Sequence, residues 1–132
     1  MSAANELLAA IQSRLTADAA LVAQIGPEGL RDRAAAGKQF PCLLLGEMLT
    51  NDYSTATEGG EEHLFSIEIW TEAGGRRLAE EIAAMVRALL DDAPLALESR
   101  ALVLLRHRST RTVRDVKAKL HMAELRFRAV TE

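Results

Sequence analysis

The spacing of the hydrophobic residues changes in the middle of the chain, between residues 63 and 90. From His63 to Thr71 apolar and polar residues alternate, with β-branched and aromatic side chains among them, which predicts a strand. From Arg76 onward the apolar residues recur at spacings of three and four, which predicts an amphipathic helix. Gly74-Gly75 lies between the two segments, where the chain must reverse. The pattern therefore predicts a strand followed by a helix that packs back across it.

The N-terminal region predicts a helix over residues 3–16, since its leucines and isoleucine form one stripe behind a Ser2 N-cap. Asp18 is positioned to cap a second, short helical turn that ends at Gly26-Pro27. Residues 27–40 are expected to form a loop, because Ala34-Ala35-Ala36 is too short to predict a helix.

Three further strands are predicted. The compact apolar run from Cys42 to Met48 is typical of a strand buried on both faces. Residues 50–62 are polar and too long for a tight turn, which predicts a mobile loop or an extended hairpin tip. The last two strands span 101–113 and 119–130, and a bulge or bend near Ala123 would bring Leu120 and Met122 into phase.

This order predicts an α+β fold, α-β-β-α-β-β, in a single domain over residues 1–132. Two hairpins would form a four-stranded, mostly antiparallel sheet with two main helices on one face, while the strand order cannot be read from the pattern. The core should be formed by the apolar residues that the alternation of the strands and the helical spacing place on the facing sides of these elements. They are Phe65, Ile67, Ile69, Leu78, Ile82, Val86, Leu89, Leu125 and Phe127.

The net charge of −3 is unevenly distributed. Residues 1–99 hold seven basic and 16 acidic side chains, net −9, whereas residues 100–132 hold nine and three, net +6. Either the two parts neutralise each other within one fold, or they meet across a subunit boundary.

Known catalytic and cofactor-binding patterns are not found in the sequence. His63, His107 and His121 lie in predicted strands without metal-ligand spacing, and Cys42 in an apolar run is expected to be an inert core thiol. Phosphate-binding glycine fingerprints and nucleophile elbows are not found. We therefore predict no enzyme, no cofactor, no metal and no catalytic residue.

The cellular compartment is predicted from the cysteine count and from the signal-peptide and membrane-span patterns. A single cysteine cannot form an internal disulfide, which favours synthesis in a reducing cytoplasm. The chain shows neither the pattern of a signal peptide nor an apolar stretch approaching the ~20 residues of a membrane span, so no membrane association is predicted.

A basic cluster follows in the second predicted hairpin: Arg106, Arg108, Arg111, Arg114, Lys117 and Lys119. We expect Arg106 and Arg108 to share one strand face. A nucleic-acid-binding module is one interpretation. The five aromatic residues of the chain do not interleave with the cluster, so a solvated or interfacial hairpin is favoured.

Alternation also predicts an interaction surface. If Phe65, Ile67 and Ile69 face the helices, Leu64 and Trp70 must lie on the opposite sheet face, together with Arg126 and Arg128. An apolar anchor ringed by charges is typical of a protein–protein contact. The alternative is that the first helix covers Trp70 within the same chain. The candidate subunit or partner interface comprises Asp52, Tyr53, Ser54, Thr55, Leu64, Trp70, Arg111, Arg114, Lys117, Arg126 and Arg128.

An ordered set of segments resembles one family. The segments are Pro41–Glu47, Glu62-His63, Trp70, Gly74-Gly75, Ile82–Leu90, Pro94-Leu95, Arg114-Asp115, His121 and Leu125–Ala129. Together they resemble the tail-completion or tail-terminator proteins of tailed phages, prophages and gene transfer agents. Relatives often carry Asp-Gly in the last hairpin, whereas Asp115-Val116-Lys117-Ala118 here has no glycine, which leaves the turn geometry open.

The resemblance implies a structural virion protein at the head–tail junction, assembled in the bacterial cytoplasm. Such proteins form a homo-oligomeric ring, typically a hexamer, that terminates the tail tube and docks it to the head connector or stopper protein. DNA passes through the lumen without sequence-specific binding, and the family offers no catalytic residues to carry over. The Ala- and Arg-rich composition suits a GC-rich host, which is consistent with a gene transfer agent but does not separate it from a phage.

Overall fold

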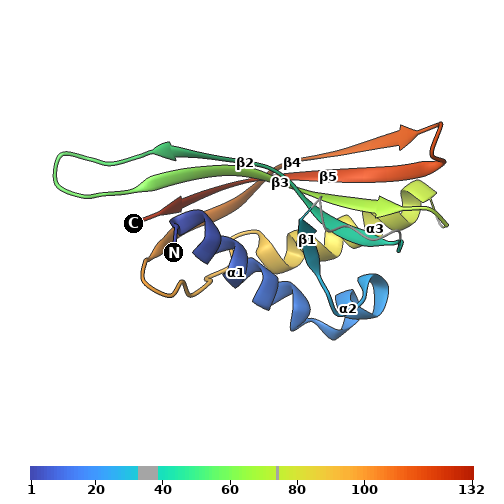
Figure 1. Ribbon diagram of the computed structural model, residues 1–132, viewed down its shortest axis with the longest axis horizontal. Coiled ribbons are helices and arrows are strands. Elements are labelled where there is room, and N and C mark those ends of the chain that lie inside the picture. Colours follow the sequence, from blue (N-terminus) through green and yellow to red (C-terminus); the bar gives the residue numbers. More distant parts are fainter. Residues whose placement is uncertain (33–38, 74) are drawn as a thin grey trace.

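The computed structural model describes residues 1–32, 39–73 and 75–132 (Figure 1). In chain order the elements are α1 (Ala3–Thr16), α2 (Ala19–Ile25), β1 (Leu30–Asp32), β2 (Cys42–Asp52), β3 (Glu61–Thr71), α3 (Gly75–Leu90), β4 (Leu102–Asp115) and β5 (Leu120–Thr131). The α+β class is confirmed. The sheet, however, has five strands in the order β1-β2-β3-β5-β4, and it is mixed because β1 runs parallel to β2.

The prediction of a four-stranded sheet with two main helices was therefore incomplete. The expected loop 27–40 contains β1, a strand of three residues whose sequence is too short to show a period. Its existence depends on a tertiary contact, the pairing of Leu30 with Leu43 of β2. Gln12 of α1 supports it by accepting a hydrogen bond from the Leu30 amide at 2.8 Å. The alanine run 34–36 lies outside the described residues.

The N-terminal helices begin where their capping residues predict. Ser2 Oγ accepts a hydrogen bond from the Asn5 amide at 3.1 Å, and Asp18 Oδ2 accepts one from the Leu21 amide at 3.0 Å. Gly26 ends α2 with φ +88°, a conformation that glycine adopts without steric cost. The short second turn is thus a helix in its own right.

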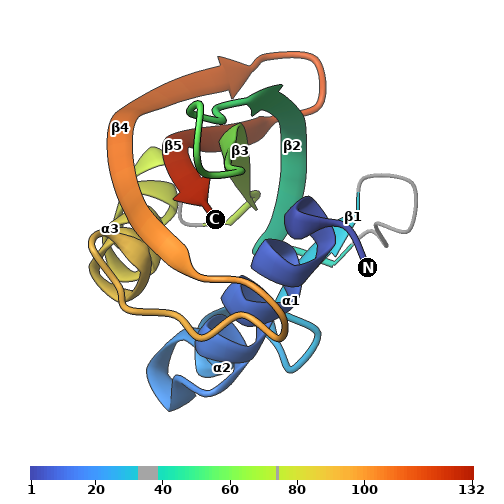
Figure 2. The ribbon, with the colours of Figure 1, turned by 90° about the vertical axis from the view of Figure 1, so that its left-hand side faces the viewer.

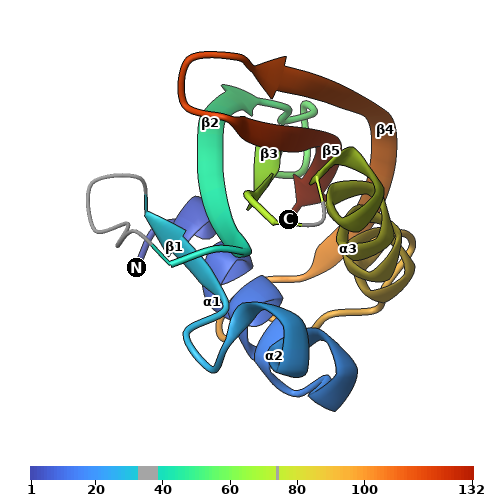
Figure 3. The ribbon, with the colours of Figure 1, turned by 90° about the vertical axis from the view of Figure 1, so that its right-hand side faces the viewer.

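All three helices cover one face of the sheet (Figures 2 and 3). Leu7, Ile11 and Leu15 of α1 share one buried cluster with β3 and the apolar face of α3. The predicted core residues are buried, except that Leu78 and Leu89 at the edges of the α3 face are half-buried. Phe65 and Phe127 stack across β3 and β5 with 5.5 Å between ring centroids. The core prediction is confirmed.

Bulges occur on β2 and β4 instead of β5. The pairing of β5 with β3 is continuous from His121 to Thr131, so the predicted bulge near Ala123 was wrong. Met122 needs no correction of phase, because it lies on the outer sheet face opposite Trp70. On β2, Gly46 and Glu47 together oppose one residue of β3, and a Cβ at Gly46 would collide with Ser66 Oγ.

The β2–β3 connection is an extended hairpin. Backbone bonds continue past the strands, from the Tyr53 amide to the Gly60 carbonyl at 2.9 Å and from the Thr55 amide to the Glu58 carbonyl at 2.8 Å. The predicted hairpin tip is confirmed. Burial of β2 on both faces holds only for its first residues, Cys42 to Leu44, because the strand then leaves the core, and Leu49 is 54% exposed.

Candidate assembly surface

The outer face of the sheet, opposite the helices, carries alternate residues of β3 and β5. Leu64 pairs with Arg128, Ser66 with Arg126, Glu68 with Glu124 and Trp70 with Met122. The predicted sharing of one face by Leu64, Trp70, Arg126 and Arg128 is confirmed. In end-on views β2 and β4 rise on either side of β3 and β5 (Figures 2 and 3). Ser66, Glu68 and Glu124 are buried even though they point away from the helices.

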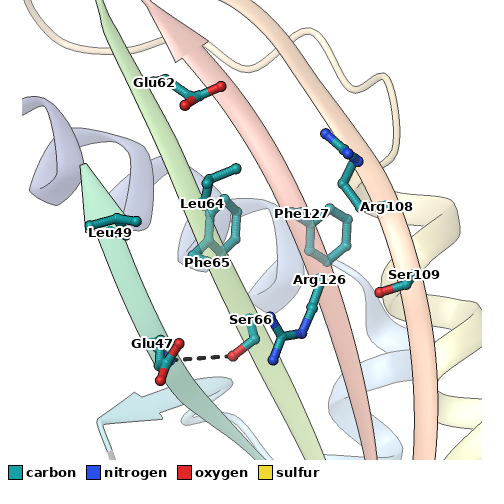
Figure 4. A pocket seen from close by; sticks show the side chains of 10 residues that line it. All are labelled: Glu47, Leu49, Glu62, Leu64, Phe65, Ser66, Arg108, Ser109, Arg126 and Phe127. Carbon is teal, nitrogen blue, oxygen red and sulfur yellow. Dashed lines mark hydrogen bonds between the residues drawn. The ribbon is translucent and has the colours of Figure 1, made fainter. Parts of the chain in front are cut away.

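A groove of about 520 Å³ lies on this face (Figure 4). Its lining comes from four strands: Glu47, Leu49, Glu62, Leu64, Phe65, Ser66, Arg108, Ser109, Arg126 and Phe127. Both carboxylates belong to β2 and β3, and both guanidinium groups belong to β4 and β5. The groove therefore has an apolar floor at Leu64 and charges of opposite sign on its two sides.

Arg128 of β5 contacts the base of the β2–β3 hairpin through two side chains. Its Nε donates to Glu62 Oε2 at 2.6 Å, and its guanidinium carbon lies 5.5 Å from the centroid of the Tyr53 ring. The hydrogen bond from Arg128, and then that from Asn51, lowers the pKa of the Glu62 carboxyl below its ordinary value. The hairpin base thus has a fixed direction relative to the sheet.

The carboxylates in the middle of the face have partners within the chain. Arg126 Nε lies 3.0 Å and Arg111 Nη2 3.5 Å from Glu124 Oε1. Trp70 Nε1 donates to Glu68 Oε1 at 3.0 Å. The charged ring that was predicted around Trp70 and Leu64 therefore exists, and much of it is paired internally.

Trp70 is half-buried by the end of the β4–β5 hairpin and not by α1, so the alternative that the first helix covers it was wrong. The apolar residues of α1 pack on the opposite sheet face. A second cavity, of about 380 Å³, lies beside the indole; we name it the Trp70 pocket. It is lined by Trp70, Val113, Arg114, Asp115, Val116, Lys117 and Met122.

The remaining candidate residues lie at the two far ends of the molecule (Figure 1). At one end, Asp52 Oδ1 accepts hydrogen bonds from Ser54, from the amide at 3.0 Å and from the hydroxyl at 2.6 Å, so the tip is locally ordered. These bonds lower the pKa of Asp52. Thr55 Oγ1 accepts from the Glu58 amide at 3.0 Å. Arg114 and Lys117 lie at the other end, so one chain does not bring the two groups together.

Several surface residues were missed by sequence reasoning. Val113, Val116 and Met122 line the Trp70 pocket, and a search for apolar residues in an otherwise polar hairpin end would have found the two valines. The bulge on β4 was also missed, and it falls within the basic cluster. Arg106 lies opposite Arg128 of β5 and forms an ion pair with Asp91 at 3.3 Å, whereas Arg108, the extra residue of the bulge, lines the groove. Because Arg128 and the groove both belong to the outer sheet face, the expectation of a common face for these two arginines agrees with the strand pairing.

The histidines and the cysteine are mostly in structural positions. His63 is fully buried between Thr50 Oγ1 at 2.9 Å and Thr131 Oγ1 at 3.0 Å, and burial lowers its pKa. His107 contacts Thr110 Oγ1 at 2.7 Å. His121 departs from the expectation of a satisfied ring, because its buried Nδ1 has no hydrogen-bond partner among the described residues. Burial raises the pKa of the Cys42 thiol.

Among the described residues, no group of three or more His, Cys, Asp or Glu side chains is arranged to hold a metal ion. None of the described helices has the length and apolar character needed to cross a membrane.

Fold and surface together define a class: a small α+β domain with one helix-covered sheet face, one charged and grooved face, and two long hairpin ends. Comparison with known proteins adds the family. Residues 9–132 match the model of the family described as "Tail completion protein gp17". The chain belongs to this tail-completion family.

The fold is also similar to a chain in the solved virion of a native gene transfer agent (GTA) particle. Sequence identity is 32%, the TM-score is 0.89, and the match covers 99% of this chain and 98% of that one. No curated protein sequence matches the chain.

Proposed function

We propose that this protein is a structural component of a phage-like particle, located at the head–tail junction. In the proposal residues 1–132 act as a single tail-terminator-like domain, and six copies form a ring that closes the tail tube and joins it to the head connector or stopper. DNA passes through the lumen, and no reaction or cofactor is involved.

One observation carries the proposal: the likeness to a chain of a gene transfer agent virion extends over almost the whole of both chains. Because the match covers almost all of both chains, the likeness includes the two hairpins along with the core. The family match over residues 9–132 supports the same assignment.

The test is deletion of the gene in a cell that produces particles, with complementation by the native protein. We expect separate heads and tails in the deletion strain, and joined particles after complementation. Labelled protein should be found at the junction, and averaged electron micrographs of that region should show sixfold density. Joined particles in the deletion strain, or label elsewhere on the particle, would contradict the proposal.

The alternative, a nucleic-acid-binding module, rests on the basic second hairpin. Arg106, Arg111, Arg126 and Arg128 each pair with a carboxylate of the same chain, which leaves fewer charges for a phosphate backbone. A salt-dependent affinity of the isolated monomer for short DNA would favour this alternative.

A further inference from the structure

The two hairpin ends have opposite charge and lie at opposite ends of the molecule (Figure 1). Residues 50–62 hold four acidic side chains and no basic one: Asp52, Glu58, Glu61 and Glu62. Residues 111–119 hold four basic side chains against Asp115: Arg111, Arg114, Lys117 and Lys119. Arg114, Lys117 and Lys119 form no ion pair with the described residues, so their charges are available to a partner.

The exposed large apolar side chains are concentrated at the same two ends. At the acidic end, Leu49 is 54% and Tyr53 is 53% exposed. At the basic end, Val113 is 41% and Val116 is 71% exposed. These are four of the six large apolar side chains that are exposed in the described part of the chain. Apolar groups surrounded by charges of one sign are typical of the centre and rim of an interface.

The basic end also offers a concave site. The Trp70 pocket is lined by apolar groups, namely the indole, Met122 and the two valines, and by two basic side chains, Arg114 and Lys117, against one acidic side chain, Asp115. Pockets of this kind hold aromatic side chains well, because an aromatic ring buries a large area at a small cost in side-chain entropy. The single tyrosine of the chain is on the acidic tip.

We propose that the β2–β3 tip of one copy docks into the Trp70 pocket of the next copy. Tyr53 enters the pocket, and Asp52 and Glu58 lie beside Arg114 and Lys117. The contact joins two different surfaces, so repeated copies follow one another head to tail and close into a ring when the rotations sum to a full turn. This inference rests on the proposed function, since it supplies the subunit contact of the proposed ring.

The geometry of the β2–β3 hairpin favours docking of its tip into the Trp70 pocket of another copy over docking into the pocket of its own chain. Arg128 contacts the base of the tip through Glu62 and Tyr53. The β2–β3 tip lies at the opposite end of the molecule from the β4–β5 hairpin, whose residues line the Trp70 pocket (Figure 1). The tip of a chain therefore lies far from its own pocket and is presented to a neighbour with much of its direction already set, which lowers the entropic cost of binding.

Cysteine cross-linking in assembled particles tests the contact. The double variant Tyr53→Cys with Val116→Cys should, after oxidation, give a covalent ladder up to the size of the ring. Each single variant should give no cross-link, because a head-to-tail contact brings two different residues together. The matched control is Tyr53→Cys with Val103→Cys, since Val103 is also 51% exposed but lies at the start of β4. A dimer from either single variant, or no ladder in particles that contain the double variant, overturns the docking.

Charge exchange provides a second measurement that does not depend on oxidation. Lys117→Glu or Glu58→Lys should each lower the yield of joined particles about tenfold or more, since like charges then face each other across the contact. The two changes together should restore the yield. Normal joining by both single variants, or a double variant that joins no better than the single variants, overturns the inference while the proposed function stands. Joined particles in a strain without the protein would instead refute the proposed function itself.

Discussion

At the residue scale, Glu6 is the most strongly perturbed carboxylate. It lies near the start of α1 and is buried, and it accepts hydrogen bonds from the Ser99 amide at 2.7 Å, the Ser99 hydroxyl at 2.8 Å and Arg100 Nε at 2.8 Å. The Ser99 backbone bond, followed by the Arg100 bond, lowers its pKa from 4.5 to about 2. One side chain thus ties the first helix to the segment that leads into β4.

The pH dependence follows from the sign of this shift. A carboxyl whose pKa is lower in the folded state stabilises the fold above its unfolded pKa of 4.5, and this contribution is lost as pH falls towards about 2. We therefore expect Glu6→Gln to lower Tm at neutral pH, and the difference from the native protein to shrink between pH 4.5 and 2. Thermal melts at several pH values measure this, with the exposed Glu80→Gln as control. A difference in Tm that does not change with pH would contradict it.

Gly46 illustrates a second residue-scale constraint, since its missing side chain allows β2 to approach Ser66 closely. Gly46→Ala should destabilise the fold by about 1–3 kcal/mol, the usual cost of forcing atoms into a packed site. Adding Ser66→Ala removes the hydroxyl that the new methyl would strike, so the double variant should regain part of the loss. A double-mutant cycle by denaturant unfolding measures the coupling, and additive effects would show that the two positions do not interact.

At the element scale, α3 and the two hairpins have different roles. The buried face of α3 is continuous with the core, whereas most of the β2–β3 tip has no apolar support. Ile82→Ala should therefore cost roughly 2–5 kcal/mol of unfolding free energy through the cavity it leaves. The exposed Glu81→Ala on the same helix, which removes only a surface pair with Arg77, should cost less than about 1 kcal/mol. Equal Tm values for the two variants would mean that the helix face is assigned wrongly.

The β2–β3 tip should change its dynamics on assembly. Its turn is held by local bonds such as that between Asp52 and Ser54, while its side chains from Asp52 to Gly59 are exposed. Amide exchange over residues 50–61 is expected to be fast in the isolated subunit and slowed in the particle, because a neighbour then covers the tip. Fast exchange in both states would count against an interface at this end.

At the scale of the whole molecule, the two oppositely charged parts of the chain partly neutralise each other. Glu6 with Arg100, Glu62 with Arg128, and Asp91 with Arg106 all join the acidic first part to the basic last part. These pairs support neutralisation within one fold. At the two hairpin ends Glu61, Glu62 and Arg111 are also paired within the chain. The end charges that form no ion pair with the described residues are Asp52, Glu58, Arg114, Lys117 and Lys119. The second interpretation, contact across a subunit boundary, therefore applies to a smaller set of residues than the sequence implied.

If copies pair through these charges as proposed, formation of the proposed ring should weaken as salt rises. The screening length falls from ~10 Å at 0.1 M to ~3 Å at 1 M salt, so exposed pairs at an interface rim lose most of their attraction. Purified protein added to separated heads and tails should restore joining less well at high salt. The variant Arg114→Glu with Lys117→Glu should join poorly at every salt concentration. Normal joining and an unchanged ring in this variant would argue against the basic hairpin as a contact.

Local sequence determined most of the elements, because caps and periods are short-range properties. Ser2, Asp18 and Gly26 marked both N-terminal helices, and alternation in β3 placed Phe65 and Trp70 on opposite faces. The alternation also separated the core residues from the candidate surface residues. For this reason Leu64, Trp70, Arg126 and Arg128 were correctly placed on one face.

Only the tertiary structure decided the features that depend on pairing between distant segments. β1 forms because β2 offers it an edge, and the bulges on β2 and β4 are defined only by their pairing with β3 and β5. The Trp70 pocket joins residues from β3, the end of β4, the following turn and β5, and the separation of the acidic and basic hairpin ends follows from the antiparallel pairing of β3 with β5. These are long-range contacts, and a local pattern of hydrophobic and polar residues contains no information about which distant segments will lie side by side.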